Sequence, residues 1–522
     1  MLVLGIEGTA WAASAAVYDD TTDEVHVETD AYQPDSGGIH PREAAEHMRE
    51  AVPQVVEDAL AAADGPIDAV AFSRGPGLGP CLRIVATAAR TLAQRLDVPL
   101  VGVNHMVAHL EIGRHRSGFE SPVCLNASGA NAHVLGYRNG RYRVLGETMD
   151  TGVGNAIDKF TRHVGWSHPG GPKVEAAAAE GEYVDLPYVV KGMDFSFSGI
   201  TSAAAAAVDD GTPVEDVCRG LQETVFAMLT EVAERALSLT GRDELVLGGG
   251  VAQNRRLQAM LTEMADERGA DFFVPEDRFL RDNAGMIAVL GAEMARAGET
   301  LAVEDSSVDP DFRPDQVPVT WHSGEAVDVS HDGDEIRGAE AVVTMAADRV
   351  TKRRLPKSYR HPALDERLRR RRTREEVRLT HDARREGVPT PVVVDVDLSE
   401  FTIVFERVGE RDLRDALDGD RVAAVGRHLA TLHGAGLVHG DPTTRNVRVD
   451  ADRTYLVDFG LGYYSRDVED FAMDLHVFEQ SLRGTADDPG TLAERFETAY
   501  RSGGDPAVID QLRAIEGRGR YQ

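Results

Sequence analysis

The chain has 522 residues, 42% of them hydrophobic, and is long enough for two or three domains with cores of their own. Its 87 acidic residues outnumber its 56 basic ones, and the net charge of −31 argues against a generally basic, nucleic-acid-binding surface. No apolar run could cross a membrane and the three cysteines lie far apart, so we expect a cytoplasmic protein without a membrane partner or a disulfide framework.

Lysine is scarce, because all but five of the basic residues are arginines. A chain this acidic and poor in lysine is expected where high salt screens the repulsion between its carboxylates. The composition therefore predicts a halophilic source.

The chain opens with a predicted strand, LVLGIEGT at residues 2–9. No lysine or arginine precedes this apolar run and Glu7 interrupts it, which argues against a signal peptide. Further strands are predicted in DAVAFSRGPG (68–77) and ELVLGGGVAQN (244–254), separated by alanine-rich helical patterns. This alternation predicts an α/β fold for a first domain over residues 1–324.

Four glycine-rich turns in this domain each follow a predicted strand. They are GIEGTA (5–10), SRGPGLGP (73–80), NASGAN (126–131) and GGGVAQN (248–254). One such turn usually marks only a tight bend, but four in one domain predict backbone amides gathered around a phosphate or nucleotide. Their spacing fits the actin, Hsp70 and sugar-kinase fold, in which two similar halves close on a nucleotide.

Two histidines in VGVNHMVAHLEIG (101–113) form a candidate metal site. His105 and His109 stand four residues apart, so on a helix they share one face with Cβ atoms about 6 Å apart. Asp282 in FLRDNAGMIA is the candidate third ligand, although aspartate before a helix is also a common N-cap. A metalloprotease HExxH site would need glutamate after the first histidine, where this chain has Met106.

Seven motifs occur in order along residues 1–320, and together they resemble one enzyme family. They are GGIHPREAAEHM, SRGPGLGPCLR, NHMVAH, AIDKFTRHVGWSHPGGPKVE, FSFSGI, GGGVAQN and DNAGMIA. This set is similar to the archaeal and eukaryotic members of the universal tRNA threonylcarbamoyl-transfer family. These members are the catalytic subunits of the KEOPS complex. The resemblance covers nearly all of the first domain.

The resemblance implies a metal-dependent transferase. His105, His109 and Asp282 would hold one metal, and two histidines with a carboxylate suit iron or zinc. Threonylcarbamoyl would pass from its adenylate to the N6 amine of the adenosine beside the tRNA anticodon. The positions implied to contact the adenylate are Asn126, Ala127, Ser128, Gly129, Ala130, Asp158, Gly171, Glu175 and Asn254.

The chain departs from the family pattern at two positions in the NASGAN turn. Archaeal relatives carry a metal-binding tyrosine where this chain has Asn126, so a fourth protein ligand at Asn126 stays open. Ala130 replaces a glycine, which narrows the turn slightly.

The amino-acid composition changes around residues 313–335, which are polar and rich in turn residues. This stretch predicts a linker, with a domain boundary near residue 325 and a second domain over residues 333–522. Early in that domain, residues 349–374 contain twelve basic residues against Asp365 and Glu366. The basic segment predicts either a solvated helix face or a surface that docks on a phosphate backbone, including at 367–374.

The stretch GLVHGDPTTRNVRVDADRTYLVDFGLG (436–462) has the spacing of a kinase catalytic region. Asp441 would orient the attacking hydroxyl as the base, while Asn446 and Asp458 would bind Mg²⁺. Upstream, Lys352 at a strand end and Glu376 on the next helix are the natural pair for holding the phosphates of ATP.

Residues 338–520 resemble the small atypical serine/threonine kinase of KEOPS, through GAEA, KRRLPKSYRHPALDERLRRRRTREE, HGDPTTRNV and EGRGR. The whole chain thus looks like an archaeal fusion of two KEOPS proteins. It lacks a GxGxxG loop, has HGD in place of HRD, and leaves no room for a long activation loop. We expect autophosphorylation and ATP hydrolysis coupled to tRNA modification rather than general peptide phosphorylation.

The sequence therefore predicts a bifunctional tRNA-modification enzyme whose partners are tRNA, threonylcarbamoyl-adenylate and other KEOPS subunits. The adenylate would come from a separate enzyme. The non-enzymatic alternative is a nucleotide-binding scaffold whose ATP sites switch a complex without chemistry, and the intact candidate sites argue against it.

Overall fold

The computed structural model describes residues 1–32, 40–138, 140–322, 335–451 and 453–518. By its internal contacts the chain divides into two compact units. The first consists of Met1–Tyr188 and Ser196–Val327, and the second of Val189–Phe195 and Asp328–Gln522. The predicted boundary near residue 325 lies outside the described residues.

The first unit contains two five-stranded sheets with the same strand order. The first sheet runs β3-β2-β1-β4-β5 and the second runs β8-β7-β6-β11-β12. Each has three antiparallel strands followed by two strands added in parallel. This repeated topology confirms the predicted α/β fold with two similar halves.

The strands of both sheets have these bounds: β1 (Leu2–Glu7), β2 (Ala12–Asp19), β3 (Glu24–Ala31), β4 (Ala69–Gly75), β5 (Leu100–Asn104), β6 (Val123–Ala127), β7 (Ala132–Arg138), β8 (Arg141–Glu147), β11 (Glu244–Gly248) and β12 (Asp271–Phe273). The helices of this unit are α1 (Pro41–Ala61), α2 (Gly79–Leu96), α3 (His105–Ser117), α4 (Val153–His163), α5 (Gly171–Glu180), α6 (Ser198–Asp209), α7 (Val214–Thr240), α8 (Arg255–Arg268), α9 (Asp277–Leu280) and α10 (Ala284–Arg296).

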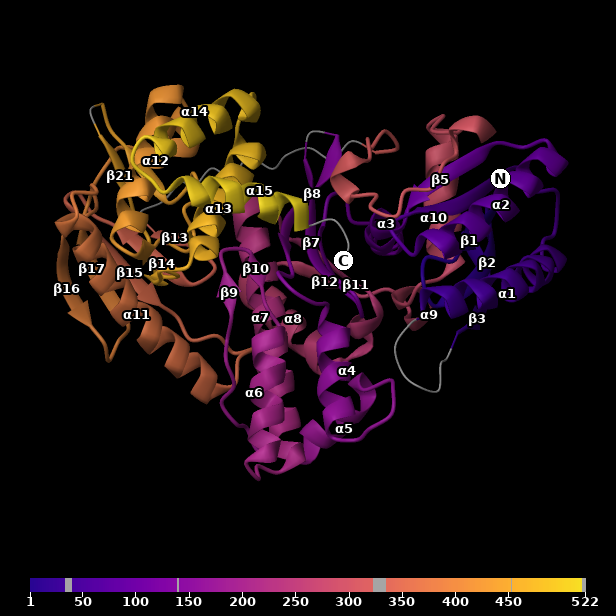
Figure 1. Ribbon diagram of the computed structural model, residues 1–522, viewed down its shortest axis with the longest axis horizontal. Coiled ribbons are helices and arrows are strands. Elements are labelled where there is room, and N and C mark those ends of the chain that lie inside the picture. The colour runs from indigo at the N-terminus through magenta and orange to yellow at the C-terminus, as the bar shows by residue number, and fades with distance from the viewer. Residues whose placement is uncertain (33–39, 139, 323–334, 452, 519–522) are drawn as a thin grey trace. The chain divides into compact units, whose positions relative to one another are not determined.

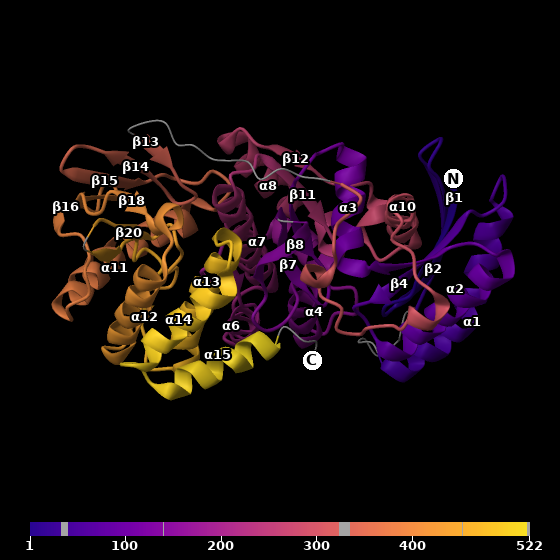
Figure 2. The same ribbon diagram turned by 90° about the horizontal axis from the view of Figure 1, so that it is seen from above.

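Helices cover both faces of the first sheet, and side-chain alternation along β1 assigns the faces. Leu4 and Ile6 pack in one core cluster with α1 and α2, whereas Val3 packs in the other with α3 and α10. Figure 1 shows α10 on one side of β1 and α2 on the other, and Figure 2 shows α1 and α2 together, away from α10. Glu7 has the same parity as Val3, so its side chain belongs to the face that α3 and α10 cover.

Gly5 lets α10 approach β1 closely. A Cβ atom at this position would lie 2.5 Å from the carbonyl oxygen of Ala284 and 2.7 Å from the amide nitrogen of Ala288. Only the lack of a side chain permits this contact between strand and helix. Gly5, the first glycine of GIEGTA, therefore sets the position of the first turn of α10.

Helix α3 lies between the two halves of the first unit. It contacts α10 on one side and β11 of the second sheet on the other. The second sheet is packed against the long, largely buried helix α7, which also contacts α5 and α8. Residues on α3 are thus within reach of strand ends from both sheets.

The second unit begins with a five-stranded antiparallel sheet, ordered β13-β14-β15-β17-β16, and continues mainly as helices. Its strands are β13 (Glu335–Arg337), β14 (Ala341–Met345), β15 (Arg349–Arg354), β16 (Val393–Asp397), β17 (Thr402–Glu406), β18 (Arg411–Asp412), β19 (Leu437–Val438), β20 (Val447–Val449), β21 (Thr454–Leu456) and β22 (Tyr463–Tyr464), together with the hairpin β9 (Val190–Lys191) and β10 (Asp194–Phe195). Its helices are α11 (Pro362–Arg385), α12 (Gly419–Gly434), α13 (Val468–Thr485), α14 (Pro489–Arg501) and α15 (Pro506–Arg518).

The described part of the predicted linker belongs to the first unit. Val317 and Val319 are buried in the same core cluster as α3 and α10. Pro318 forms a β-bridge with Arg141. The turn-rich residues 313–322 thus cross the core of the first unit, although their composition predicts a linker.

The basic segment 349–374 makes many ion pairs inside the second unit. On α11, Arg369 pairs with Asp365 at 2.6 Å and Arg370 with Glu366 at 2.8 Å. Such pairs between residues four apart neutralise part of the segment's charge. No helix in the described part of the chain is both long and apolar enough to cross a membrane.

Candidate functional site

His105 and His109 lie at the start of α3, directly after β5. Asn104 caps this helix, its side chain accepting from the amides of Met106 at 3.0 Å and Val107 at 3.1 Å. Both histidines are buried, and their ring centroids are 4.8 Å apart. The strand end and the cap therefore fix both imidazoles on one helix face, as the HxxxH spacing predicts.

Asp282 approaches both histidines from the turn before α10. Its Oδ1 atom lies 3.3 Å from Nε2 of His105 and 3.3 Å from Nε2 of His109. The neighbouring Asn283, not Asp282, caps α10 by accepting from the amide of Met286. The alternative interpretation of Asp282 as an N-cap is therefore wrong.

Two further residues, Glu7 and Trp11, contact the side chains of His105 and Asp282 and fix their orientation. Glu7 is fully buried at the end of β1, accepting from the amide of Thr9 at 2.8 Å and lying 3.2 Å from Nδ1 of His105. The indole N–H of Trp11 donates to Oδ2 of Asp282 at 2.8 Å. These contacts leave Nε2 of His105 and Oδ1 of Asp282 turned toward each other.

The electrostatics of the cluster favour positive charge. Burial alone would lower the pKa of His105, but Glu7 and Asp282 raise it to about 10. Burial would raise the pKa of Asp282, yet the neighbouring imidazoles hold it far below its usual range. Burial lowers the pKa of His109. The buried Glu7 and the partly buried Asp282 thus form, with the two imidazoles, a site that attracts a cation.

The donor atoms of His105, His109 and Asp282 could hold a metal ion, because all lie within 4.8 Å of one another. When a metal displaces the Nε2 proton of His105, Nδ1–H can still donate to Glu7 and Nε2 offers its lone pair to the metal, as in many metal-binding histidines. Two imidazole nitrogens and one carboxylate oxygen are ligands that zinc and iron accept. The residues present therefore fit a metal.

The NASGAN segment, residues 126–131, starts with the last two residues of β6 and continues as a compact loop. Ser128 donates its hydroxyl to the carbonyl of Asn131 at 2.9 Å. The amide of Asn155, in the first turn of α4, donates to the carbonyl of Gly129 at 2.9 Å. A Cβ atom on Gly152 would lie 2.3 Å from the backbone of Ala130, so the glycine before α4 permits this close packing.

Asn126 itself is buried and incompletely satisfied. Its Nδ2 lies 3.8 Å from Sδ of Met106, and its Oδ1 has no hydrogen-bond partner among the described residues. A buried amide oxygen without a partner is costly and often marks an absent ligand. A role of Asn126 as fourth metal ligand stays a prediction.

The remaining positions that the resemblance implies for contact with the adenylate fall on three helices. Asp158 on α4 accepts from the amide of Gly170 at 2.8 Å, directly before Gly171 at the start of α5. Glu175 on α5 accepts from the amide of Arg255 at 2.9 Å. Asn254 caps α8 by accepting from the amides of Arg256 and Leu257. These contacts bring Glu175 and Asn254 to the same end of α8.

In the second unit, Lys352 joins two carboxylates that are far apart in sequence. Its Nζ lies 2.9 Å from Oε1 of Glu376 on α11 and 2.6 Å from Oδ1 of Asp458. Lys352 lies within β15, which continues to Arg354 rather than ending at the lysine. Arg354 pairs with the other oxygen of Glu376 at 2.6 Å. Partial burial alone would raise the pKa of Asp458, but Lys352 and Arg354 lower it to about 2.

Asp441 and Asn446 meet in a loop between β19 and β20. The side-chain amide of Asn446 donates to Oδ2 of Asp441 at 2.9 Å and to its backbone carbonyl at 2.8 Å. Asp474 on α13 anchors the preceding residues, accepting from the amides of His439 at 2.6 Å and Gly440 at 2.8 Å. The acidic helix after DFG therefore supports the loop that carries Asp441.

Sequence reasoning missed the supporting residues Glu7, Trp11, Arg354 and Asp474. Glu7 had a signal, since a carboxylate inside an apolar strand needs a buried partner. Arg354 also had one, because alternation along a strand places it on the same side as Lys352. Trp11 and Asp474 gave none, because their partners are hundreds or tens of residues away.

Comparisons with known proteins show the family to which the chain is similar. The TsaD family, described as tRNA N6-adenosine threonylcarbamoyltransferase, matches residues 21–289. A Halobacterium salinarum protein named "Probable bifunctional tRNA threonylcarbamoyladenosine biosynthesis protein" is 72% identical over 526 residues, covering 100% of this chain and 99% of its own. Proteins of the same name from Haloarcula marismortui and Methanospirillum hungatei are 70% and 50% identical, and each comparison covers at least 99% of both chains. The similarity to halophile proteins agrees with the halophilic source predicted from composition.

Proposed function

We propose a division of labour within this chain, which belongs to the tRNA N6-adenosine threonylcarbamoyltransferase family and is a bifunctional tRNA threonylcarbamoyladenosine biosynthesis enzyme. The enzyme modifies tRNA by transferring threonylcarbamoyl to the N6 amine of an adenosine. The first unit carries this transfer, and the second is a kinase or ATPase that regulates it.

His105, His109 and Asp282 hold the metal of the transferase site in this proposal. The supporting observation is the convergence of three donor atoms, from two buried histidines on α3 and the partly buried Asp282 in the turn before α10. Glu7 keeps the proton on Nδ1 of His105, and Trp11 directs Oδ2 of Asp282 away from the donor set. When bound, iron or zinc supplies Lewis acidity and a template for positioning oxygen atoms of the substrate.

Threonylcarbamoyl-adenylate binds beside this cluster, from the loop after β6 to the ends of α5 and α8. Backbone amides of Ala127, Ser128, Gly129 and Ala130 suit phosphate oxygens. Asp158 and Glu175 suit ribose hydroxyls, because one carboxylate accepts from both hydroxyls. Asn126, Gly171 and Asn254 complete the proposed set. An activated mixed anhydride needs no protein nucleophile, so orientation and exclusion of water are the main tasks of these residues.

A test of the transferase site compares Asp282→Asn with Asp277→Asn, an exposed residue five positions earlier. Purified proteins receive threonylcarbamoyl-adenylate and unmodified tRNA, with and without chelator, and metal content is measured by elemental analysis. We expect Asp282→Asn to lose both metal and modified adenosine, and Asp277→Asn to keep both. An Asp282→Asn protein with full metal content would refute the assignment.

The second unit binds ATP and Mg²⁺ in this proposal. Lys352 and Glu376 form the buried pair that holds the phosphates, and Asp458 and Asn446 bind Mg²⁺. Asp441 orients the attacking hydroxyl or water. The convergence of Lys352, Glu376 and Asp458 from three separate segments supports the proposal. Residues 461–467 alone separate DFG from α13, too few for a long activation loop.

An Asp441→Asn variant tests the second unit. Because Asp441 acts on the attacking group, ATP turnover should fall while ATP binding stays near the wild-type level. A Lys352→Met variant should lose binding as well. Unchanged turnover in Asp441→Asn would contradict the assigned role. The proposal also includes other KEOPS subunits as partners, which the fused arrangement of the chain supports. It includes a cytoplasmic location as well.

A further inference from the structure

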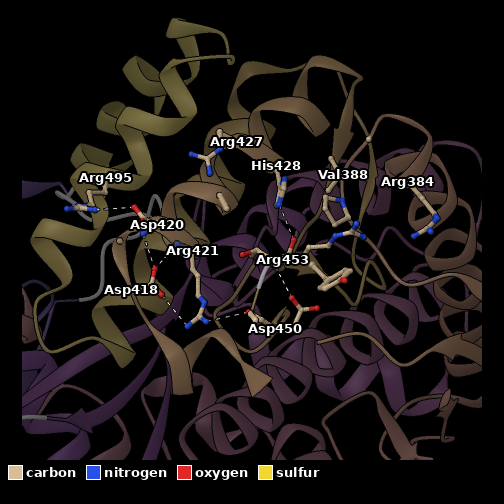
Figure 3. A pocket seen from close by; sticks show the side chains of 17 residues that line it. Arg384, Val388, Asp418, Asp420, Arg421, Arg427, His428, Asp450, Arg453 and Arg495 are labelled. Carbon is tan, nitrogen blue, oxygen red and sulfur yellow. Dashed lines mark hydrogen bonds and ion pairs between the residues drawn. The ribbon is translucent and has the colours of Figure 1, made fainter. Parts of the chain in front are cut away.

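A second pocket lies in the second unit, apart from the residues of the proposed ATP site. It has a volume of about 910 Å³ and lies among the end of α11, the helices α12 and α14, and the turn between β20 and β21 (Figure 3). Its lining includes five arginines: Arg384, Arg421, Arg427, Arg453 and Arg495. None of Lys352, Glu376, Asp441, Asn446 and Asp458 lines it.

The carboxylates in the pocket are already engaged. Asp418 caps α12, accepting from the amides of Asp420 at 3.0 Å and Arg421 at 2.9 Å, and pairs with the Arg421 side chain at 3.2 Å. Asp420 lies 3.6 Å from Arg495. A third lining carboxylate, Asp450, accepts from the backbone amide of Arg453 at 2.8 Å, so five arginines and three aspartates line the pocket.

The five arginines and three aspartates give the lining a net charge of +2, and three of the guanidinium groups form no ion pair with a described residue. Arg384 donates to the carbonyl oxygen of Thr390 at 2.6 Å, a neutral acceptor. Arg427 and Arg453 are exposed, and neither they nor Arg384 form an ion pair with any described residue. Figure 3 shows the Arg427 side chain without a dashed contact. The pocket is thus a local centre of positive charge.

Such a centre is unexpected on this chain. Acidic residues outnumber basic ones by 87 to 56, so an arginine readily meets a carboxylate, as the pairs along α11 show. Positive charges gathered without partners repel one another, and a bound anion would remove that cost. Guanidinium groups suit phosphate in particular, because their parallel N–H donors match its oxygens.

We propose that this pocket binds the phosphodiester backbone of the tRNA substrate. The established substrate of the enzyme is a polyanion, and the three arginines sit on different elements, which suits successive phosphates better than one compact anion. Tyr455 and His428 in the lining add ring surfaces on which a nucleoside can rest. The proposal does not depend on the assigned ATP site, because the two share no lining residue.

The test uses the full-length enzyme and an unmodified tRNA transcript. One triple variant carries R384Q, R427Q and R453Q. The matched control carries R42Q, R49Q and R385Q, which are 90%, 72% and 71% exposed. Each triple lowers the net charge from −31 to −34. Arg385 is adjacent to Arg384 but does not line the pocket, so the control separates local contact from overall charge.

Affinity is measured against salt, with circular dichroism confirming that each protein is folded. Three lost phosphate contacts lower the slope of log K against log salt by about 2, which weakens binding about tenfold near 0.3 M salt and little near 1 M. The control should stay within about twofold of wild type. Single variants R384Q and R427Q should each lower the slope by about 0.7.

Equal affinity and slope in the pocket triple and the control would overturn the proposal. Saturating ATP and Mg²⁺ provide a second arm, and we expect them to leave tRNA affinity of the wild type unchanged. Competition between ATP and tRNA that the pocket variants abolish would also overturn it, because the pocket would then be a nucleotide site.

Discussion

The substitution Glu7→Gln isolates the buried carboxylate that supports the two histidines. Glu7 accepts from the amide of Thr9 at 2.8 Å and lies 3.2 Å from Nδ1 of His105. Glutamine keeps the shape but offers only one carbonyl oxygen, so one of these two donors faces an NH₂ group instead. His105 then loses the contact that fixes which ring nitrogen carries its proton.

The expected magnitude follows from the position of Glu7 behind the ligand rather than beside the metal. Losing such a supporting partner lowers metal affinity about 10- to 100-fold. That range corresponds to about 1.4–2.7 kcal/mol of binding free energy. Folding should weaken too, because an unsatisfied buried donor costs about 1–3 kcal/mol.

The assay is competition for zinc or iron between the protein and a chelator of known affinity, and Glu28→Gln is the control. Glu28 also lies beside a histidine, 2.8 Å from Nε2 of His26, but on the exposed strand β3. We expect the control to bind metal like the wild type. Wild-type metal affinity in folded Glu7→Gln protein would refute the supporting role and leave Glu7 a purely structural residue.

Three further perturbations test the framework around the sites. Gly5→Ala places a Cβ 2.5 Å from the Ala284 carbonyl and should destabilise the first unit by about 1–3 kcal/mol in denaturant unfolding. The control Gly199→Ala should not lower stability, because its Cβ would meet nothing within 4 Å. Equal effects of the two substitutions would contradict the close approach of α10. Asp474→Asn should lower both stability and ATP turnover, because one oxygen cannot accept from His439 and Gly440 together, and the exposed cap variant Asp467→Asn should retain wild-type turnover. Lowering salt from molar to about 0.1 M should lower the midpoint of thermal unfolding, since the carboxylates of a chain with net charge −31 then repel one another; an unchanged midpoint would argue against halophilic adaptation.

Local sequence patterns predicted several strands of the first unit. The strands at the start of the chain and in ELVLGGG were predictable because their apolar runs end in glycine turns. The linker prediction was less accurate, since turn-rich composition does not distinguish a free linker from a chain that crosses a core. Val317 and Val319 are too few and too scattered to reveal their burial from sequence.

The sequence by itself determined which residues are candidates for the chemistry, because HxxxH, D-x4-N and DFG are spacings within one helix or one loop. It could not decide whether Asp282 caps a helix or faces the histidines, since both roles use the same residue before the same helix. The tertiary structure decided it: Asn283 takes the cap, and Gly5 lets α10 pack close to β1 and α3. Contacts of Glu7 with His105, or of Asp474 with His439, join distant segments, and only packing of the whole unit brings such groups within bonding distance.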